Sequence, residues 1–411
     1  MSEKIRLGIV GLGCRGISMS GLLAERPDCV ITAVCDVYPD RMDDMASKLE
    51  NVTGLRPACI ADYRELNRRA DVDVVFVFSA WENHVPAVID AMNAGKPAAF
   101  EVGGAYSVSD CENLIRIHER TGVPVMMLEN CCYGRVEMTL TEMVRDGVFG
   151  EVIHCTGGYM HDLRSEIAGG RVNRHYRLRN YLSRNCENYP THELGPISRI
   201  LDIGHGNRFT SLVSVSSKSA GINDFVGRNP DKYDPELATA RFAQGDVVTT
   251  ILTTAQGQTV TLTLDTTLPR PYCRGLSIHG TRGWFEEDNR SVYTDADNTE
   301  ADHFKWRKFW GNYDGYEEKY MPSLWRDYLS SGIKKGHGGM DFLVLDSFLS
   351  SIKDGDVPPL DVYDSAVLMA VTPLSAVSAA SGGIPVAFPD LTAGIDSSER
   401  RVNRGKYALW K

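Results

Sequence analysis

Short apolar runs and longer amphipathic segments alternate along the first third of the chain. The apolar runs lie at residues 5–10, 29–37, 71–80, 97–102 and 123–130, and a segment with helical periodicity lies at 81–95. Short apolar runs bounded by turn residues are typical of strands buried on both faces. Strands that alternate with helices predict a doubly wound parallel sheet.

The pattern changes after about residue 131. An amphipathic helix is predicted at 136–150, and stretches rich in β-branched residues and glycine turns follow at 151–162, 211–220, 238–268 and 275–287. These stretches predict antiparallel strands, whereas residues 223–236 are predicted to be a polar surface loop. Two further helices are predicted at 336–355 and 361–381. The expected fold is therefore α/β, with a parallel-sheet domain over 1–131, an α+β domain with an open, mainly antiparallel sheet over 132–335, and C-terminal helices and a tail over 336–411.

The composition and the first residues indicate which partners and which location to expect. The chain has 411 residues, 43% of them hydrophobic, and a net charge of −10, which gives no reason to expect nucleic acid or an anionic membrane as partner. No uninterrupted apolar run approaches the roughly 20 residues that span a bilayer. The first residues enter a strand without the apolar region of a signal peptide, so a cytoplasmic location with reduced cysteines is expected. The histidines form no HExxH pattern, Cys131 and Cys132 show no CxxC spacing, and no metal site is expected.

A glycine motif follows the first strand. Gly11, Gly13 and Gly16 have GxGxxG spacing, which serves a tight turn, close approach of a pyrophosphate and close packing of helix on strand. Asp36 ends the second strand, 20 residues after Gly16, where an acid binds the ribose hydroxyls. An acid there repels a 2′-phosphate, so a Rossmann domain that binds NAD is predicted. The same turn carries the candidate cofactor contacts Cys14 and Arg15. The alternative is a plain tight turn with Asp36 as a helix cap.

Further cofactor candidates follow from the position of the strand ends. Ligands of doubly wound sheets bind beyond the carboxyl ends of the strands. The residues at those ends are Ser79, Trp81, His84, Glu101, Glu129 and Asn130. The alternatives are core packing for Trp81 and a solvated helix face for His84.

At this point the sequence resembles the Gfo/Idh/MocA oxidoreductases, in the order of the glycine motif, the acid, the helix that starts with Trp-Glu, and "AGKPAAFE" at 94–101. Sugar and inositol dehydrogenases of that superfamily carry Glu-Lys-Pro where this chain has Glu101-Val102-Gly103. They also carry an Asp and a His four residues apart, where this chain has Asn188 and His192. The glutamate and the histidine are therefore present, and the lysine and the aspartate are replaced.

These replacements resemble one branch, the NAD-dependent α-N-acetylgalactosaminidases and related glycosidases. The motifs that carry the resemblance are "MMLENCCYGR" at 126–135, "YPTHELGP" at 189–196, "DTTLPRPY" at 265–272 and "GHGGMDF" at 336–342. Members of that branch have glycine where this chain has Glu193, which leaves the exact sugar open.

The resemblance implies a cycle without net redox: transient oxidation at sugar carbon 3, elimination of the group on carbon 1, water addition and re-reduction. It implies an acid/base pair of His192 and Tyr133, with Tyr272 as a third catalytic group, against the alternatives of a helix cap, packing and a loop anchor. It also implies a homo-oligomer formed through the open sheet, and C-terminal helices that pack back on the first domain. The sugar-contact candidates are His161, Arg164, Tyr176, Arg179, Asn185 and Tyr189, against the alternative of a solvated loop.

Two other functions stay open on the sequence. One is an NAD-dependent sugar or inositol dehydrogenase that uses His192 alone. The other is an NAD-binding sensor or assembly protein without catalysis, which the many polar residues at the strand ends disfavour. The expected substrate is in any case a small carbohydrate.

Overall fold

The computed structural model describes residues 4–297, 304–334, 336–392 and 400–410, and these residues form two compact units. The first unit consists of residues 1–130, 331–367 and 400–411, and the second of residues 131–330 and 368–399. The predicted fold class is confirmed, because the first unit contains a parallel sheet and the second a mostly antiparallel one.

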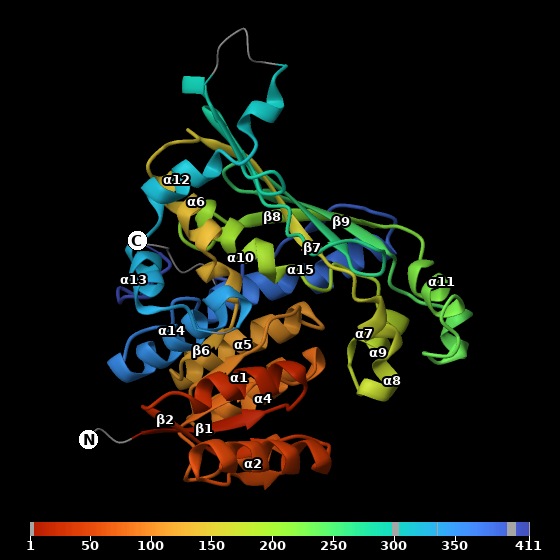
Figure 1. Ribbon diagram of the computed structural model, residues 1–411, viewed down its shortest axis with the longest axis vertical. Coiled ribbons are helices and arrows are strands. Elements are labelled where there is room, and N and C mark those ends of the chain that lie inside the picture. The colour runs from red at the N-terminus through yellow and green to blue at the C-terminus, as the bar shows by residue number, and fades with distance from the viewer. Residues whose placement is uncertain (1–3, 298–303, 335, 393–399, 411) are drawn as a thin grey trace. The chain divides into compact units, whose positions relative to one another are not determined.

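The first unit is built on a six-stranded parallel sheet in the order β3-β2-β1-β4-β5-β6, with helices on both sides (Figure 1). Its strands are β1 (Ile5–Val10), β2 (Cys29–Cys35), β3 (Ala58–Ile60), β4 (Val74–Val77), β5 (Ala98–Phe100) and β6 (Val125–Met127). Its helices are α1 (Cys14–Ala24), α2 (Pro39–Thr53), α3 (Tyr63–Asn67), α4 (Trp81–Asn93), α5 (Val108–Thr121), η5 (His337–Gly339) and α14 (Met340–Asp354). This strand order is that of dinucleotide-binding folds.

The apolar runs of the sequence form the centre of this sheet. All residues of β4, β5 and β6 are buried, as expected for strands covered on both faces. The C-terminal stretch adds to the same unit through ion pairs. Arg400 binds Asp361 and lies 2.7 Å from Asp364, and Arg26 lies 2.6 Å from Asp346 on α14.

The second unit is built on an eight-stranded sheet in the order β13-β12-β11-β7-β10-β9-β8-β14. The strands are β7 (Val152–Met160), β8 (Phe209–Ser216), β9 (Val247–Thr254), β10 (Thr259–Asp265), β11 (Ser277–Gly280), β12 (Gly283–Glu286), β13 (Ser291–Thr294) and β14 (Val386–Ala387). The helices are α6 (Arg135–Arg145), α7 (Arg164–Ala168), α8 (Gly170–Asn173), α9 (Arg177–Ser183), α10 (Thr191–Ile200), α11 (Gly221–Gly227), η2 (Pro235–Ala238), η3 (Asp295–Asp297), η4 (Trp306–Phe309), α12 (Tyr313–Tyr320) and α13 (Ser323–Ser331). The short helix η1 (Asn130–Tyr133) joins the units.

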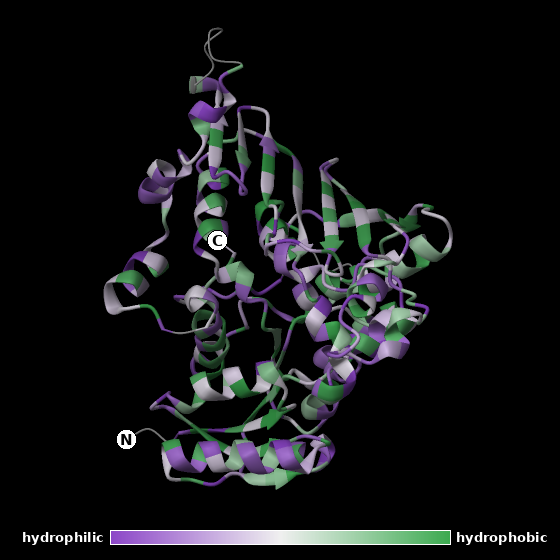
Figure 2. Ribbon diagram, turned by 45° about the vertical axis from the view of Figure 1, so that its right-hand side comes forward, coloured by the Kyte–Doolittle hydropathy of each residue, from purple (hydrophilic) through white to green (hydrophobic). Residues whose placement is uncertain are grey.

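One face of the larger sheet is apolar and the other is rich in threonine. On β10, Val260, Leu262 and Leu264 are buried, and the threonines between them are half-buried. Figure 2 shows the resulting stripes along the strands of this sheet. Helix α10 packs against β7 and α6. The alternation therefore fixes which face of the sheet carries the helices and which stays open.

Several helices of the second unit were not predicted. Helix α9 lies among the sugar-contact candidates, for which a solvated loop was the alternative, and α11 occupies part of the predicted loop 223–236. In α9 the residues Arg177, Leu178, Asn180 and Tyr181 are buried, which is a helical face made partly of polar side chains. Periodicity of apolar residues does not detect such a face.

The long helix α15 (Val362–Ala380) begins in the first unit and continues into the second. By length and composition alone it could cross a membrane, but 83% of its most apolar window is buried inside the protein. This burial is typical of a core helix.

Glu187 supplies a test of the packing in the second unit. Its side chain is buried, and burial raises its pKa to about 8. When a carboxyl has a higher pKa in the folded state than in the unfolded state, the free energy of unfolding of the protein falls as pH rises. The fall takes place between the unfolded-state pKa of glutamate, about 4.3, and the folded-state pKa. We expect the free energy of unfolding of Glu187→Gln, relative to that of the wild type, to rise by about 3 kcal/mol between pH 5.5 and pH 8.5. Urea denaturation at the two pH values measures this difference. The exposed Glu112→Gln is the control, and a gap that does not change with pH would contradict the assignment.

Candidate functional site

The glycine motif of the first unit has the geometry that its spacing predicts. Gly11 has φ of +92°, and a Cβ there would lie 2.5 Å from the backbone nitrogen of Ser79. A Cβ on Gly16 would collide with the carbonyl oxygen of Gly11, whereas one on Gly13 would meet nothing nearer than Arg41 at 4.0 Å. The first and third glycines thus allow close packing, and the second leaves open space at the start of α1.

The start of α1 suits an anion. Its N-cap, Gly13, offers no side-chain hydrogen bond, and its first turn contains no acidic residue. Free backbone amides and the positive end of the helix dipole therefore remain for a phosphate group. These are observations that fit the pyrophosphate of a dinucleotide.

Asp36 lies beside this turn, at the end of β2. Its Oδ2 accepts a hydrogen bond from the backbone nitrogen of Leu12 at 2.7 Å, and its Oδ1 accepts one from Tyr38 at 3.0 Å. Each carboxylate oxygen has a further lone pair, so the group keeps acceptor capacity for ribose hydroxyls. The carboxylate is held where a 2′-phosphate would be repelled.

Arg15 joins the glycine motif to two distant segments. Its Nε donates to Glu101 at 3.0 Å, and its Nη1 donates to Asp341 at 2.9 Å. Asn130 donates to the other oxygen of Asp341 at 2.7 Å. Burial raises the pKa of Asp341, but hydrogen bonds from His337 and Arg15 outweigh it and hold that pKa well below its usual range. Asp341 belongs to the motif "GHGGMDF", but its role was not predicted from the sequence.

Trp81 and His84 lie at the start of α4, and both are buried. Gly103, with φ of +135°, leaves room for the Trp81 indole, because a Cβ there would collide with it. His84 Nε2 lies 2.9 Å from the carbonyl oxygen of Ser79, and burial lowers the pKa of His84. The alternative of a solvated helix face is therefore wrong for His84. Its side chain instead contacts the backbone of Ser79, just after β4.

The second unit brings together an aromatic and imidazole cluster from three segments, which we call the Tyr159 cluster. It consists of Tyr159, His161, Tyr189, His192 and Tyr272. The ring of Tyr159 lies 4.3 Å from Tyr189 and 5.5 Å from His192, and Tyr189 lies 4.9 Å from His192. Tyr272 lies 6.1 Å from Tyr159 and is half-exposed. Four of these residues were predicted, and Tyr159 was not.

A buried guanidinium faces this cluster. Arg177 lies 5.1 Å from the ring centre of Tyr189 and 3.0 Å from a carboxylate oxygen of Glu166. Burial lowers the pKa of Arg177, but the charges of Tyr176, Tyr159 and Glu166 outweigh it and raise that pKa well above its ordinary value. By reciprocity, the cation stabilises negative charge that develops on the phenols. Its neighbours Tyr176 and Arg179 are predicted from the sequence as sugar contacts, whereas Arg177 is not.

The hydroxyl of Tyr159 also lies 3.1 Å from Nδ1 of His161. Burial lowers the pKa of His161, and the charge of Arg177 lowers it further. The imidazole is therefore mostly neutral at pH 7 and can accept a proton from the phenol or donate a hydrogen bond to it. A phenol, two imidazoles and a cation at these distances are suited to proton transfer.

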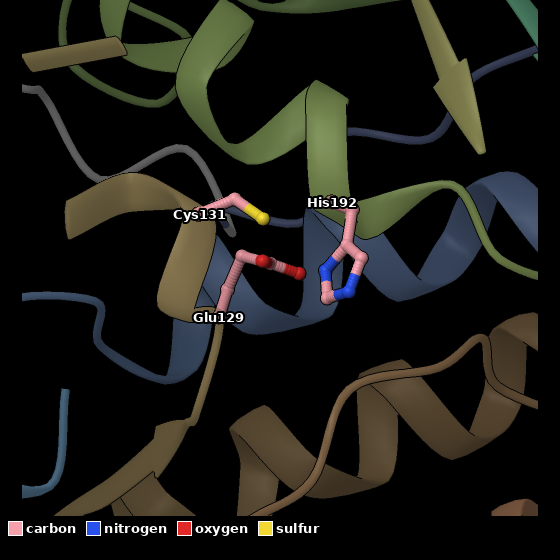
Figure 3. Close-up of side chains that lie close together, drawn as sticks. All are labelled: Glu129, Cys131 and His192. Atoms are coloured by element: carbon pink, nitrogen blue, oxygen red, sulfur yellow. The ribbon is translucent and has the colours of Figure 1, made fainter. Parts of the chain in front are cut away.

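Cys131 lies close to His192 as well. Its sulfur and a ring nitrogen of His192 are within 4.8 Å of each other. Figure 3 shows these two side chains together with Glu129, which precedes Cys131 by two positions in the chain. A catalytic zinc takes three protein ligands. Cys131 and His192 could supply two of these ligands, both from the second unit. We assign no metal to them, and the absence of a metal stays a prediction.

Other predicted residues have different surroundings. Tyr133 is fully buried, and its carbonyl oxygen accepts a hydrogen bond from Trp325 at 2.9 Å. Asn185 accepts hydrogen bonds from Ser216 and Gly245 at 2.8 and 3.1 Å, which is a structural role between loops. Arg164 binds its neighbour Asp162 at 2.7 Å. Contact of these residues with a sugar stays a prediction.

Tyr176 and Arg179 complete the predicted sugar contacts. The ring of Tyr176 stacks on His175 at 4.5 Å, and Arg179 is exposed. Of the two family positions that differ, Val102 is buried, and Asn188 donates to Gln244 at 3.2 Å. Neither side chain has an acid/base function, because valine and asparagine do not titrate.

Comparisons with known proteins agree with this geometry. Residues 5–129 match a family described as an oxidoreductase family with an NAD-binding Rossmann fold, and residues 133–396 match one described as the C-terminal domain of glycosyl hydrolase 109. The cofactor of the first unit is therefore NAD, which the open glycine turn and Asp36 fit.

Curated relatives match over nearly the whole chain. A glycosyl hydrolase family 109 protein of Stenotrophomonas maltophilia is 32% identical over 95% of this chain and 90% of its own length. A protein of Tannerella forsythia named alpha-N-acetylgalactosaminidase is 34% identical over 95% of this chain and 86% of its own length.

Solved structures show the same fold at low identity. A myo-inositol 2-dehydrogenase from Lactobacillus plantarum has a TM-score of 0.66 at 14% identity, covering 94% of this chain and 100% of its own. The WlbA dehydrogenase from Bordetella pertussis, in complex with NADH and UDP-GlcNAcA, has a TM-score of 0.66 at 15% identity, covering 95% and 99%.

Asp36 offers a test of cofactor selection. We expect Asp36→Ser to weaken NAD binding by about 10-fold or more, since hydrogen bonds to a charged group contribute about 1.5–3 kcal/mol. Binding of NADP should strengthen, because the repelling carboxylate is gone. Isothermal titration with both dinucleotides measures the change, with the exposed Asp43→Ser as control. An unchanged ratio of the two affinities would contradict the role of Asp36.

Proposed function

Because the chain belongs to glycosyl hydrolase family 109, we propose that it cleaves glycosides of α-linked N-acetylgalactosamine or a related galactoside through transient oxidation at sugar carbon 3. The observation that carries the proposal is the Tyr159 cluster, in which His192 and Tyr159 lie 5.5 Å apart with Arg177 facing the phenols. The relative from Tannerella forsythia, by its name, supports this sugar.

The reaction needs two proton transfers besides the redox step. One group takes the proton of the carbon 3 hydroxyl during oxidation, and another takes the proton on carbon 2 that the new ketone acidifies. The bond from carbon 1 to the aglycone then breaks, and water adds to the enone. Bound NAD supplies the oxidation at carbon 3 and its reversal, so no net redox results.

His192 and Tyr159 are the proposed acid/base pair. An imidazole transfers protons near neutral pH, and the phenol does so because Arg177 stabilises its anion and His161 Nδ1 lies 3.1 Å from its hydroxyl. Tyr272 and Tyr189 are proposed to contact the sugar. Tyr133 keeps a catalytic role only as a prediction, and its complete burial disfavours it.

The acid/base chemistry replaces what the dehydrogenases of the superfamily obtain from lysine. Val102 and Asn188 stand at the two positions where those enzymes carry lysine and aspartate, and neither titrates. The proton transfers are therefore proposed to rest on residues of the second unit. A dehydrogenase that uses His192 alone stays the alternative.

We also propose a homo-oligomer formed through the open face of the larger sheet. Ile251 and Val215 are exposed on that face, among half-buried threonines. Contiguous apolar patches mark contacts between proteins, and Val215 and Ile251 lie on neighbouring strands, two register positions apart. The cytoplasmic location and the three-part domain division remain predictions.

The deciding assay is release of aglycone from a panel of p-nitrophenyl α- and β-glycosides in deuterated water with catalytic NAD⁺. We expect release from an α-N-acetylgalactosaminide, deuterium at carbon 2 of the product and no net NADH. EDTA should leave the rate unchanged if no metal assists. NADH that accumulates with a free sugar or inositol, without release of any aglycone, would instead identify a dehydrogenase.

A pair of tyrosine variants separates the two candidate bases. We expect Tyr159→Phe to lower kcat by about 100-fold or more, the usual contribution of a positioned acid/base group, and to lower deuterium incorporation in parallel. Tyr133→Phe is expected to change kcat less than about threefold while it lowers the melting temperature, because its side chain is fully buried. The reverse order would return the role of acid/base group to Tyr133.

A further inference from the structure

A buried ionic cluster lies beside Tyr272 and is not used by the proposed reaction. Its members are Arg274, Glu137, Glu193 and Glu287, and we call it the Arg274 cluster. The side chain of Arg274 is 10% exposed, and those of Glu137 and Glu193 are 2% and 0% exposed. Two carboxylates and one guanidinium that are so far from water have a large energetic effect on their surroundings, and Glu287 is the more exposed third acid.

Two glycines make room for this cluster. Gly134 precedes α6, and a Cβ there would collide with the carboxylate of Glu137. Gly157 lies in β7, and a Cβ there would collide with the side chain of Glu193. The backbone of the second unit is therefore shaped around both acids, and a buried Glu193 is possible only because β7 has glycine opposite it.

Arg274 contacts all three acids. Its Nη2 forms an ion pair with Glu137 and lies 3.5 Å from Glu287, and its Nε lies 3.7 Å from Oε2 of Glu193. Burial raises the pKa of Glu137. Burial lowers the pKa of Arg274, but the surrounding carboxylates outweigh it and keep that pKa well above its ordinary value. The arginine is therefore permanently charged.

Two short segments connect the Arg274 cluster to the Tyr159 cluster: residues 272–274 and residues 192–193. Cys273 pairs with Met160 through two backbone hydrogen bonds of 2.9 and 3.1 Å. In such extended pairing alternate residues point to the same side, so Tyr272 and Arg274 share one side, next to Tyr159. On α10, Glu193 directly follows His192. The contact between Arg274 and Glu193 thus joins the segment of Tyr272 to the turn of His192.

The charge of Arg274 also affects the pKa of Tyr272. Burial raises the pKa of Tyr272, Cys131 raises it further, and the positive charge of Arg274 lowers it. The other groups that face Tyr272 are Tyr159, Glu193 and His161. The cation and the carboxylate of Glu193 therefore act on the phenol with opposite signs.

We propose that Arg274 is a positioning residue, which fixes Tyr272 relative to His192 through Glu193 and Glu137 and sets the charge that Tyr272 experiences. This inference rests on the proposed function, because it assigns Tyr272 and His192 to the reacting sugar. It adds that Glu193 is the anchor of this arrangement, since its carboxylate lies beside Arg274 and it directly follows His192.

The test compares variants that change the charge with little change in volume. We expect Arg274→Met to lower kcat by about 10- to 100-fold with KM changed less than threefold. It should also move the pH profile of kcat upward by about 0.5 pH units or more, since loss of a cation raises the pKa values of the titrating groups around it, including the proposed acid/base pair. Glu193→Gln should move the profile downward by a similar amount. Arg274→Lys should restore the position of the profile in part.

The control is Arg228→Met, which removes an exposed arginine paired with Asp224 on α11 and should leave kcat and its pH profile unchanged. Lower kcat in both cluster variants without shifts of opposite sign would overturn the proposal and leave a purely structural clamp. If circular dichroism shows that Arg274→Met does not fold, the test rests on Glu193→Gln alone. In that case, a pH profile of kcat that does not move downward in Glu193→Gln overturns the proposal. Wild-type protein that releases no aglycone would overturn the proposed function as well, whereas active wild type with unshifted variants overturns only this inference.

Discussion

The second unit depends on the close approach of helix α10 to strand β7. Gly157 allows this approach, because any side chain there would collide with Glu193, and the Cδ1 atom of Ile197 would lie only 3.2 Å from an added Cβ. The strand then brings Tyr159, two residues further on, beside His192 in the first turn of the helix. A bulkier residue at position 157 would separate the two groups that the proposed reaction needs together.

The same constraint operates in the first unit. Gly11 and Gly16 let α1 pack on the end of β1, and this leaves the first turn of the helix open above Gly13. Close packing of backbone on backbone therefore creates both a place for phosphate groups in one unit and a phenol–imidazole pair in the other. In each case the chemistry follows from the absence of a side chain.

Arginines at the edge of each unit's candidate site, of which Arg177 is buried and Arg15 partly exposed, then hold the polar residues in place. Arg15 binds Glu101 and Asp341, and Arg177 faces the tyrosines of the Tyr159 cluster. Removing one partner of a buried pair is strongly destabilising, because the other charge is left uncompensated.

The sequence by itself determined the features that depend on local order. The spacing of Gly11, Gly13 and Gly16 predicted a tight turn that packs a helix closely on a strand, and the alternation of β10 predicted a strand with one buried face. Both are contiguous patterns, and both structures are present. Only the tertiary structure decided that Tyr159 has its ring beside His192, that Arg177 faces the phenols, and that Arg274 joins Glu137 to Glu193. The physical reason is that these partners lie from 12 (Arg177 and Tyr189) to 137 (Glu137 and Arg274) positions apart, so that their contacts depend on how β7, α6, α9 and α10 pack. No periodicity within one segment records that packing.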